Sequence, residues 1–143
     1  MQNEQDTRMS SIGIVFPHQL FENNVLTVHC DTLYLVEEYL FFRQYAFHKQ
    51  KIAFHRASMK FYEDFLQKRG VTVVYIDSYS PLADVRALIP HLRSTGAGTM
   101  HYIDTTDCWL EKRIRAACDA YNVGLIQHDS PLFLNASRDN AVF

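Results

Sequence analysis

Cysteine is scarce in this sequence of 143 residues, and its copies form no Cys-x-x-Cys pair. Three cysteines, Cys30, Cys108 and Cys118, support neither a disulfide framework nor a thiolate zinc site. None lies in a pattern with a catalytic base, so each is better explained as a structural side chain than as a nucleophile. A reducing, cytoplasmic setting fits this composition best.

Glycine is also sparse, with five residues, and none of them builds a phosphate-binding loop. No predicted strand is followed by Gly-x-Gly-x-x-Gly or by a Walker A motif. Nucleotide-phosphate binding of the familiar kinds is therefore disfavoured.

The chain has no strong charge of either sign and no long apolar run. Its formal net charge of −2 gives no global electrostatic reason to expect nucleic acid as a partner. Its polar N-terminus lacks an apolar signal core, and no run approaches the ~18 residues of a membrane span. We therefore expect a protein that is not exported, has no membrane partner and does not bind DNA tightly by itself.

Seven histidines raise the question of a metal site. On a helix, His48 and His55 would lie two turns, or about 10 Å, apart along the axis. That separation is too large for both to bind one zinc ion with bonds of ~2 Å, so we expect no metal site.

Short apolar runs alternate with helical segments along the chain. Strands are predicted near residues 11–16, 32–36, 71–76, 99–103 and 125–128. Strands that alternate with helices imply right-handed parallel βαβ units. The predicted fold is therefore α/β, a doubly wound, Rossmann-like five-stranded parallel sheet with helices on both faces. Residues 1–10 are expected to be a disordered lead-in, 11–137 one domain, and 138–143 a tail or the start of a linker.

The predicted helices differ in how clearly they begin and end. A short helical piece is expected around 40–47, before a long helix over 48–69 that ends at Gly70. Ser80 is a plausible N-cap for the next helix, in which Pro90 should cause a kink or an early end. Asp107 is a good N-cap for the following helix, which should bury Leu110, Ile114, Ala117 and Tyr121 on one face.

The long helix is apolar over about half of its circumference, which is wider than the ~100° stripe of a typical surface helix. His55 and Ser58 fall on this apolar arc, where polar groups need partners. We expect the part around Ile52, His55 and Met59 to form an interface with another domain or subunit.

Polar residues follow the predicted strands at the edge where ligands bind in doubly wound sheets. The candidates for binding a flat heteroaromatic ligand are His18, Gln19, Leu20, Glu37, Glu38, Asp104, Thr105 and Trp109. A catalytic pair of Glu37 and Glu38 is disfavoured because adjacent side chains at a strand end point in different directions. Trp109 is interpreted either as a packing anchor or as a wall of the ligand pocket.

Several stretches resemble a known family. They are Pro17-His18-Gln19-Leu20-Phe21, the Leu-Val-Glu-Glu end of the second strand, the motif FHKQKIAFHRASM over 47–59, and Ser130-Pro131-Leu132-Phe133-Leu134. Together they resemble the deoxyribodipyrimidine photolyase-related proteins, of the bacterial iron–sulfur branch of the photolyase/cryptochrome superfamily. The resemblance extends from Ser11 to about Ser137 and is most specific in the long-helix motif.

The resemblance implies an N-terminal antenna-type α/β domain that binds a lumazine or flavin-like chromophore, in light-dependent DNA repair or photoreception. In that family, FAD and the iron–sulfur cluster belong to a C-terminal helical domain, which would be the partner of this one. The residues that match the family are Gln19, Leu20, Glu37, His48, Lys49 and Lys51, whereas many relatives have Gly-Asp in place of Pro17-His18. We expect no independent catalysis. The alternative is a stand-alone nucleotide-binding or interaction module without photochemistry.

Overall fold

The computed structural model describes residues 10–38 and 49–131. Within these ranges the strands are β1 (Ser10–Val15), β2 (Thr32–Val36), β3 (Val73–Ile76), β4 (Ala97–Ile103) and β5 (Gly124–His128). All neighbouring strands are parallel, in the order β3-β2-β1-β4-β5. The chain first moves outward from β1 to β3 and then crosses back to β4. The carboxyl ends of β1 and β4 therefore flank the switch point of the sheet.

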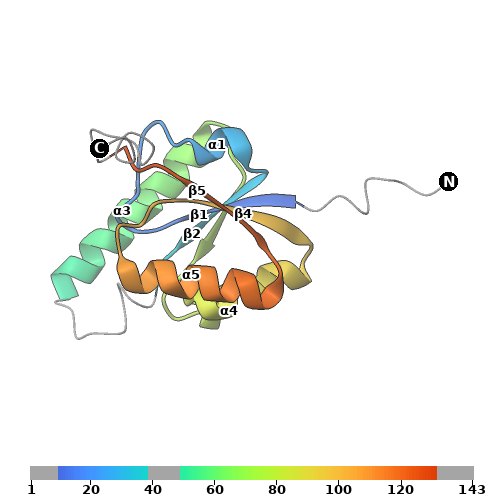
Figure 1. The fold of residues 1–143 in the computed structure, drawn as a ribbon. Coiled ribbons are helices and arrows are strands. Elements are labelled where there is room, and N and C mark those ends of the chain that lie inside the picture. The colour runs from blue at the N-terminus through green and yellow to red at the C-terminus, as the bar shows by residue number, and fades with distance from the viewer. Residues whose placement is uncertain (1–9, 39–48, 132–143) are drawn as a thin grey trace, which may run out of the picture.

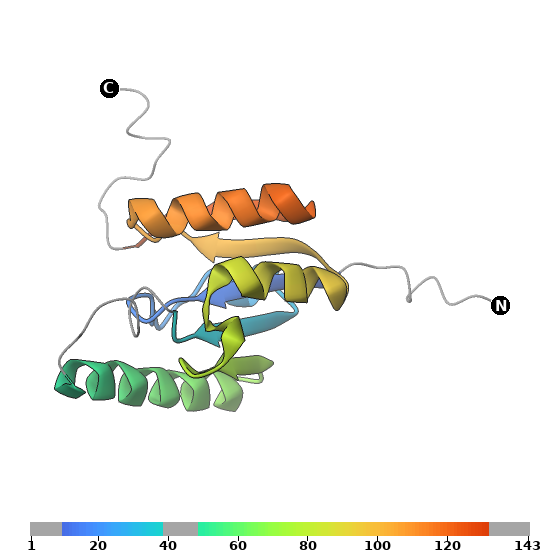
Figure 2. The same cartoon turned by 90° about the horizontal axis from the view of Figure 1, so that it is seen from below.

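Helices cover both faces of the sheet. They are α1 (Leu26–His29), α3 (Lys49–Lys68), α4 (Val85–Ser94) and α5 (Cys108–Tyr121), with a 3-10 turn, η2 (Pro81–Ala83), before α4. Figure 1 shows α4 and α5 together on one side of the sheet and α1 and α3 on the other. In Figure 2, α5 lies near β4, and α3 lies at the opposite edge of the sheet, beside β3. The predicted doubly wound α/β fold is confirmed.

Each face of the sheet has its own apolar core. Ile12, Ile14 and Tyr102 pack against α4 and α5, whereas Leu33 and Leu35 pack against α1 and α3. The alternation follows from the two-residue period of a strand, which sends successive side chains to opposite faces. Both faces are apolar because both are covered, as is usual for a parallel sheet.

Some element boundaries differ from the predictions. The short helix α1 lies before β2, where no helix was predicted, and Pro90 lies within α4 without ending it. Ser80 does cap a helical segment, but that segment is the turn η2, and the N-cap of α4 is Asp84. Tyr121 is exposed, although the other apolar residues predicted for its helix face are buried. The helical piece expected at 40–47, residues 1–9 of the predicted lead-in and the predicted tail at 138–143 lie outside the described residues. Ser10, which was predicted to be part of the disordered lead-in, is the first residue of β1.

Candidate functional site

The loop after β1 is attached to the end of β4 by Gln19. Its amide nitrogen donates to the carbonyl oxygens of Ile103 and Asp104 at 2.8 and 3.1 Å. The Gln19 side chain is almost fully buried, so these bonds form out of contact with water. Gln19 therefore links the carboxyl ends of β1 and β4, which flank the switch point.

His18 makes a second contact across the same gap. Its Nε2 donates to the carbonyl oxygen of Thr105, 2.9 Å away. Burial lowers the pKa of His18, and the hydrogen bond to Thr105 and the charge of Asp107 offset part of that effect. Burial therefore favours the neutral form of the imidazole, whose orientation is set by the backbone after β4.

Thr105 is in turn held by α5. Its hydroxyl and its backbone N–H both lie within hydrogen-bond distance of Glu111, at 3.0 and 3.2 Å. The same carboxylate accepts from the Tyr102 hydroxyl, and burial is the main cause of the raised pKa of Tyr102. His18, Gln19, Asp104 and Thr105 thus do come together, as predicted. The hydrogen bonds described here hold the loops to one another, and a ligand role for these residues stays a prediction.

The two glutamates after β2 face different helices. Glu37 is fully buried and accepts from Nε of Arg56 at 2.6 and 3.1 Å, while Nη2 of Arg56 donates to Ser78 at 2.9 Å. Glu38 accepts from the backbone N–H of Val85 at the first turn of α4, 3.1 Å away. The expectation that the two side chains point apart is confirmed. Glu37 connects α3 to the ends of β2 and β3, and Glu38 lies at the positive end of the α4 dipole.

Trp109 does not join this cluster. It is 69% exposed and lines a groove on the α4–α5 surface with Arg86 and Arg113. Its interpretation as a packing anchor is therefore wrong. The candidate residues follow β1, β2 and β4 and were expected to surround one ligand. The loops after β1 and β4 do lie together, but the Trp109 side chain lies apart from them.

The long helix exposes a different face from the one predicted. Met59 is fully buried, and Ile52 and His55 are partly buried, because they lie on the side of α3 that includes Tyr62 and Leu66. The exposed apolar side chains are Phe54 and Phe61, at 69% and 75% exposure. These two phenylalanines lie about 125° around the helix from the stripe of Met59, Tyr62 and Leu66. Met59 was expected to be open to a partner and is instead in the core, whereas an interface at Ile52 and His55 stays a prediction.

The exposed stripe borders a groove of about 580 Å³, which we call the α3 groove. It is lined by Leu20, Glu22, Phe54, Ala57, Ser58, Phe61, Tyr62 and Phe65. Tyr62 joins its base to the β1 loop, because the Tyr62 hydroxyl donates to the carbonyl oxygen of Phe21 at 2.6 Å. Leu20 is the one predicted site residue in this groove, so the groove adjoins the carboxyl end of β1.

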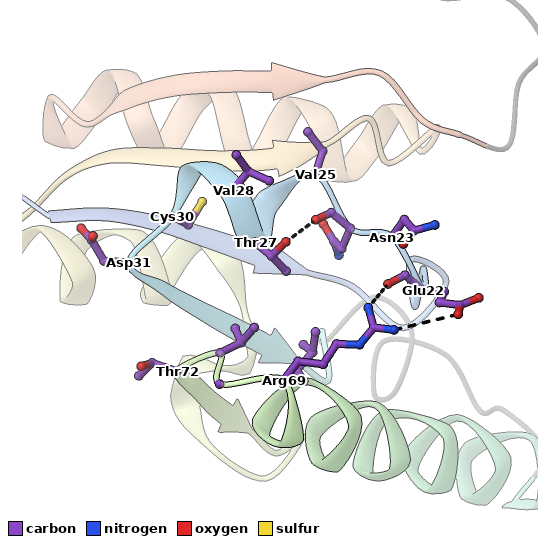
Figure 3. A pocket seen from close by; sticks show the side chains of 13 residues that line it. Glu22, Asn23, Val25, Thr27, Val28, Cys30, Asp31, Arg69 and Thr72 are labelled. Carbon is purple, nitrogen blue, oxygen red and sulfur yellow. Dashed lines mark hydrogen bonds and ion pairs between the residues drawn. The ribbon is translucent and has the colours of Figure 1, made fainter.

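A further cavity, of about 650 Å³, lies between α1 and the end of α3 (Figure 3). Arg69 crosses it and donates to the carbonyl oxygen of Glu22 at 3.2 Å. Asp31 and Thr72, which line it, directly precede β2 and β3. The cavity therefore runs from the amino ends of β2 and β3 along this face to the loop after β1 that contains Glu22 (Figure 3).

Three histidines form a stack that the sequence did not reveal. His29, His101 and His128 lie with ring centroids 5.0 to 5.7 Å apart. Nδ1 of His101 is 3.0 Å from Nε2 of His128, so one of these nitrogens donates to the other. Among residues 10–38 and 49–131, no group of three or more His, Cys, Asp or Glu side chains is placed to bind a metal ion.

Cys30 and Cys118 are not activated thiols, because their pKa values are raised and not lowered. Burial raises the pKa of Cys30 to about 12 and that of Cys118 to about 11. In the part of the chain that the structure describes, no helix is both long and apolar enough to cross a membrane.

Comparison with known proteins places these features in a family context. A sequence model of the deoxyribodipyrimidine photo-lyase-related proteins matches residues 13–142. The chain is also 33% identical over 138 residues to an uncharacterized protein of Acanthamoeba polyphaga mimivirus. That match covers 92% of this chain and 69% of the viral protein.

Proposed function

Because this chain belongs to the deoxyribodipyrimidine photo-lyase-related protein family, we propose that it acts as an antenna-type α/β domain. It docks a helical FAD-binding domain through the α3 groove, in a protein of light-dependent repair or photoreception. The family match and the doubly wound fold support the first part. The exposed aromatic face of α3 supports the second.

The α3 groove carries the docking proposal. Phe54 and Phe61 expose most of their rings on one stripe of a helix whose opposite side is already buried against the sheet. Monomeric proteins rarely leave contiguous apolar surface of this kind uncovered. Helical partners pack on such a stripe by inserting side chains between residues three, four and seven apart. Docking there would bury both rings.

Docking is tested by supplying the helical FAD-binding domain of a photolyase-related protein in trans. The double variant Phe54→Ser, Phe61→Ser should bind that domain at least about ten-fold more weakly, since each buried phenylalanine contributes about 1.5–3 kcal/mol. Trp109→Ser is the matched control, because Trp109 is equally exposed but lies on α5. Equal affinities of the double variant and the wild type in calorimetry would exclude this docking surface.

A planar chromophore fits the same edge of the sheet. The α3 groove has aromatic walls, adjoins the carboxyl end of β1 through Leu20, and has a volume within the range of small-molecule pockets. We infer that a lumazine or flavin-like molecule binds at the Leu20 end of this groove, beside the loop of His18 and Gln19, and leaves Phe54 and Phe61 to the helical partner. In this proposal the helical partner, and not this chain, binds FAD and the iron–sulfur cluster.

Chromophore binding is tested by titrating the protein into a ribityl lumazine and, separately, into FMN. The anisotropy of the chromophore's own fluorescence should rise, and the rise should be lost in Leu20→Asp. Trp109 emission is an unsuitable reporter because this side chain lies in a different groove. If neither compound shows a rise, an interaction module without a chromophore becomes the better interpretation.

A further inference from the structure

The surface formed by α4 and α5 carries a second groove that the proposed function does not use. It has a volume of about 510 Å³, and we call it the α4–α5 groove. Its lining residues are Arg86, Trp109, Lys112, Arg113, Ala116, Ala117 and Tyr121. Except for Arg86, all of them lie on α5, where helical geometry spreads them over about half of the circumference.

The groove has an aromatic side chain at each end and small side chains at its centre. Trp109 and Tyr121 are both exposed, and they are separated by about 18 Å along the axis of α5. Between them lie Ala116, which is exposed, and Ala117, which is mostly buried, so no bulky side chain of α5 lines the centre of the groove. Flat rings can therefore lie against Trp109 or Tyr121 and over the alanines without displacing a bulky side chain.

Cationic side chains surround this apolar centre. Nζ of Lys112 lies 5.3 Å from the Trp109 ring centroid, and Arg86 and Arg113 line the groove as well. Asp84 accepts from Arg86 at 2.9 Å and also interacts electrostatically with Arg113, so this one carboxylate offsets part of the charge of both arginines. Glu111, on the same helix, is directed away from the groove toward Tyr102 and Thr105. The groove therefore has a local excess of positive charge in a chain whose net charge is −2.

We propose that the α4–α5 groove binds single-stranded nucleic acid without sequence preference. Bases stack on Trp109 and Tyr121, and the phosphates lie near Lys112, Arg86 and Arg113. Stacking aromatics combined with a basic surface are the features by which proteins bind single strands of any sequence. The low net charge of the whole chain does not oppose this, since binding by two or three phosphate contacts depends on the local charge.

A strand fits the groove better than a free nucleotide does. At about 3.4 Å per stacked base, the distance between Trp109 and Tyr121 corresponds to roughly five nucleotides. A free nucleotide would contact only one of the two rings. Neither glycine loop nor phosphate cradle adjoins the described part of α5, whose first turn is capped by the carboxylate of Asp107.

The test uses a fluorescein-labelled oligothymidylate of about eight nucleotides, a length within the usual range of single-strand sites. Because Trp109 is the only tryptophan, its emission reports directly on the groove and should be quenched on binding. Anisotropy should give an affinity that falls roughly 7- to 18-fold between about 50 and about 200 mM salt, as two or three phosphate contacts require. Trp109→Ala should weaken binding at least about five-fold.

Matched variants separate this site from general electrostatic attraction. Lys112→Ala should weaken binding, whereas Lys68→Ala, which removes the same charge from α3, should not. Phe61→Ala, which removes an exposed ring from α3, should also have no effect. The proposal is overturned if no anisotropy change occurs at low salt, or if Lys68→Ala is as harmful as Lys112→Ala. It is also overturned if ATP displaces the strand at equal phosphate concentration, or if oligoglutamate displaces it and quenches Trp109 itself.

Discussion

At the scale of single residues, the contact between Glu37 and Arg56 has the clearest structural consequence. Glu37 lies at the end of β2 with no exposure, and Arg56 reaches it from the first half of α3. The same guanidinium bonds Ser78 after β3, so one side chain connects a helix to two strand ends. The Glu37 side chain is a buried anion whose described partner is this arginine, and the hydrogen bond to Glu37 raises the pKa of Arg56.

We predict that Arg56→Ala lowers the free energy of unfolding by about 2 kcal/mol, because it leaves the Glu37 carboxylate buried without its cation. Removing one partner of a fully buried ion pair would lower the free energy of unfolding further. Here the Arg56 side chain is 37% exposed, so water screens part of its interaction with Glu37. Urea denaturation measures the change. Lys68→Ala, which removes an exposed ion pair with Asp64, is the control and should leave the midpoint unchanged. Equal midpoints for the two variants would contradict a structural role for Arg56.

At the scale of elements, α3 combines a buried stripe with an exposed one. Met59, Tyr62 and Leu66 form the buried stripe, and Phe54 and Phe61 belong to the exposed one. Both stripes are apolar, so the helix is covered on one side by the sheet and remains open on another. Substitutions on the two stripes should therefore differ sharply in their effect on stability.

Met59→Ala should destabilise the fold by about 2–4 kcal/mol, since it removes a fully buried side chain and leaves a cavity. Phe54→Ala should change stability by no more than about 0.5 kcal/mol, because most of its ring is exposed. Thermal or urea unfolding of the two variants side by side gives the answer. A larger loss for Phe54→Ala would mean that the exposed stripe is covered within the protein.

The stack of His29, His101 and His128 connects α1 to β4 and β5 and should make these elements sensitive to pH. Burial lowers the pKa of His101 and of His128, and the neighbouring imidazoles lower them further, while Asp129 acts in the opposite direction on His128. In the unfolded chain these groups take up protons near pH 6.5, before the folded chain does. The unfolded state thus binds more protons below that pH, and stability must fall as the pH decreases.

We therefore predict that the urea midpoint falls between about pH 7 and about pH 5, and that the fall is smaller in His101→Gln. It should not vanish, because burial also lowers the pKa of His18 and His55. Denaturation at several pH values measures both slopes. A steeper slope in the variant than in the wild type would contradict the role assigned to the stack.

At the scale of the whole molecule, the two faces of the sheet are covered by different helices, α1 and α3 on one side and α4 and α5 on the other (Figure 1). The α1 and α3 side carries the aromatic groove proposed for a helical partner, and the α4 and α5 side carries the basic groove proposed for nucleic acid. The loops at the carboxyl edge lie between them and are held by Gln19, Glu37 and Glu38. These side chains fix the loops at the carboxyl edge, as expected of a domain that binds partners through preformed surfaces.

The 143-residue protein alone is predicted not to repair photodamaged DNA. The net charge of −2 opposes tight binding to a duplex, and the family resemblance assigns FAD to a separate helical domain. Illumination of a dimer-containing oligonucleotide with the purified protein and added FAD should leave the dimers intact, as measured by chromatography. Restoration of the bases above the rate of a protein-free sample would refute the prediction.

The order and type of the main elements followed from the sequence, because strand and helix periodicities are local properties. Thr32–Val36 was predicted with the observed bounds, and Asp107 was correctly identified as a helix cap. The strand ends were therefore placed correctly, and with them the neighbourhood of His18, Gln19 and Thr105. The family was also identified from sequence motifs, chiefly the one over 47–59.

Tertiary structure alone decided which surfaces remain open. Periodicity shows that α3 is broadly apolar, but only its packing on β2 and the other core strands selects Met59 for burial and Phe54 for exposure. Likewise, Trp109 follows β4 closely in sequence, yet the direction of α5 carries it away from the switch point to the α4–α5 surface. The histidine stack joins residues 27 and more positions apart. Such contacts depend on how the sheet is wound, which no local pattern encodes.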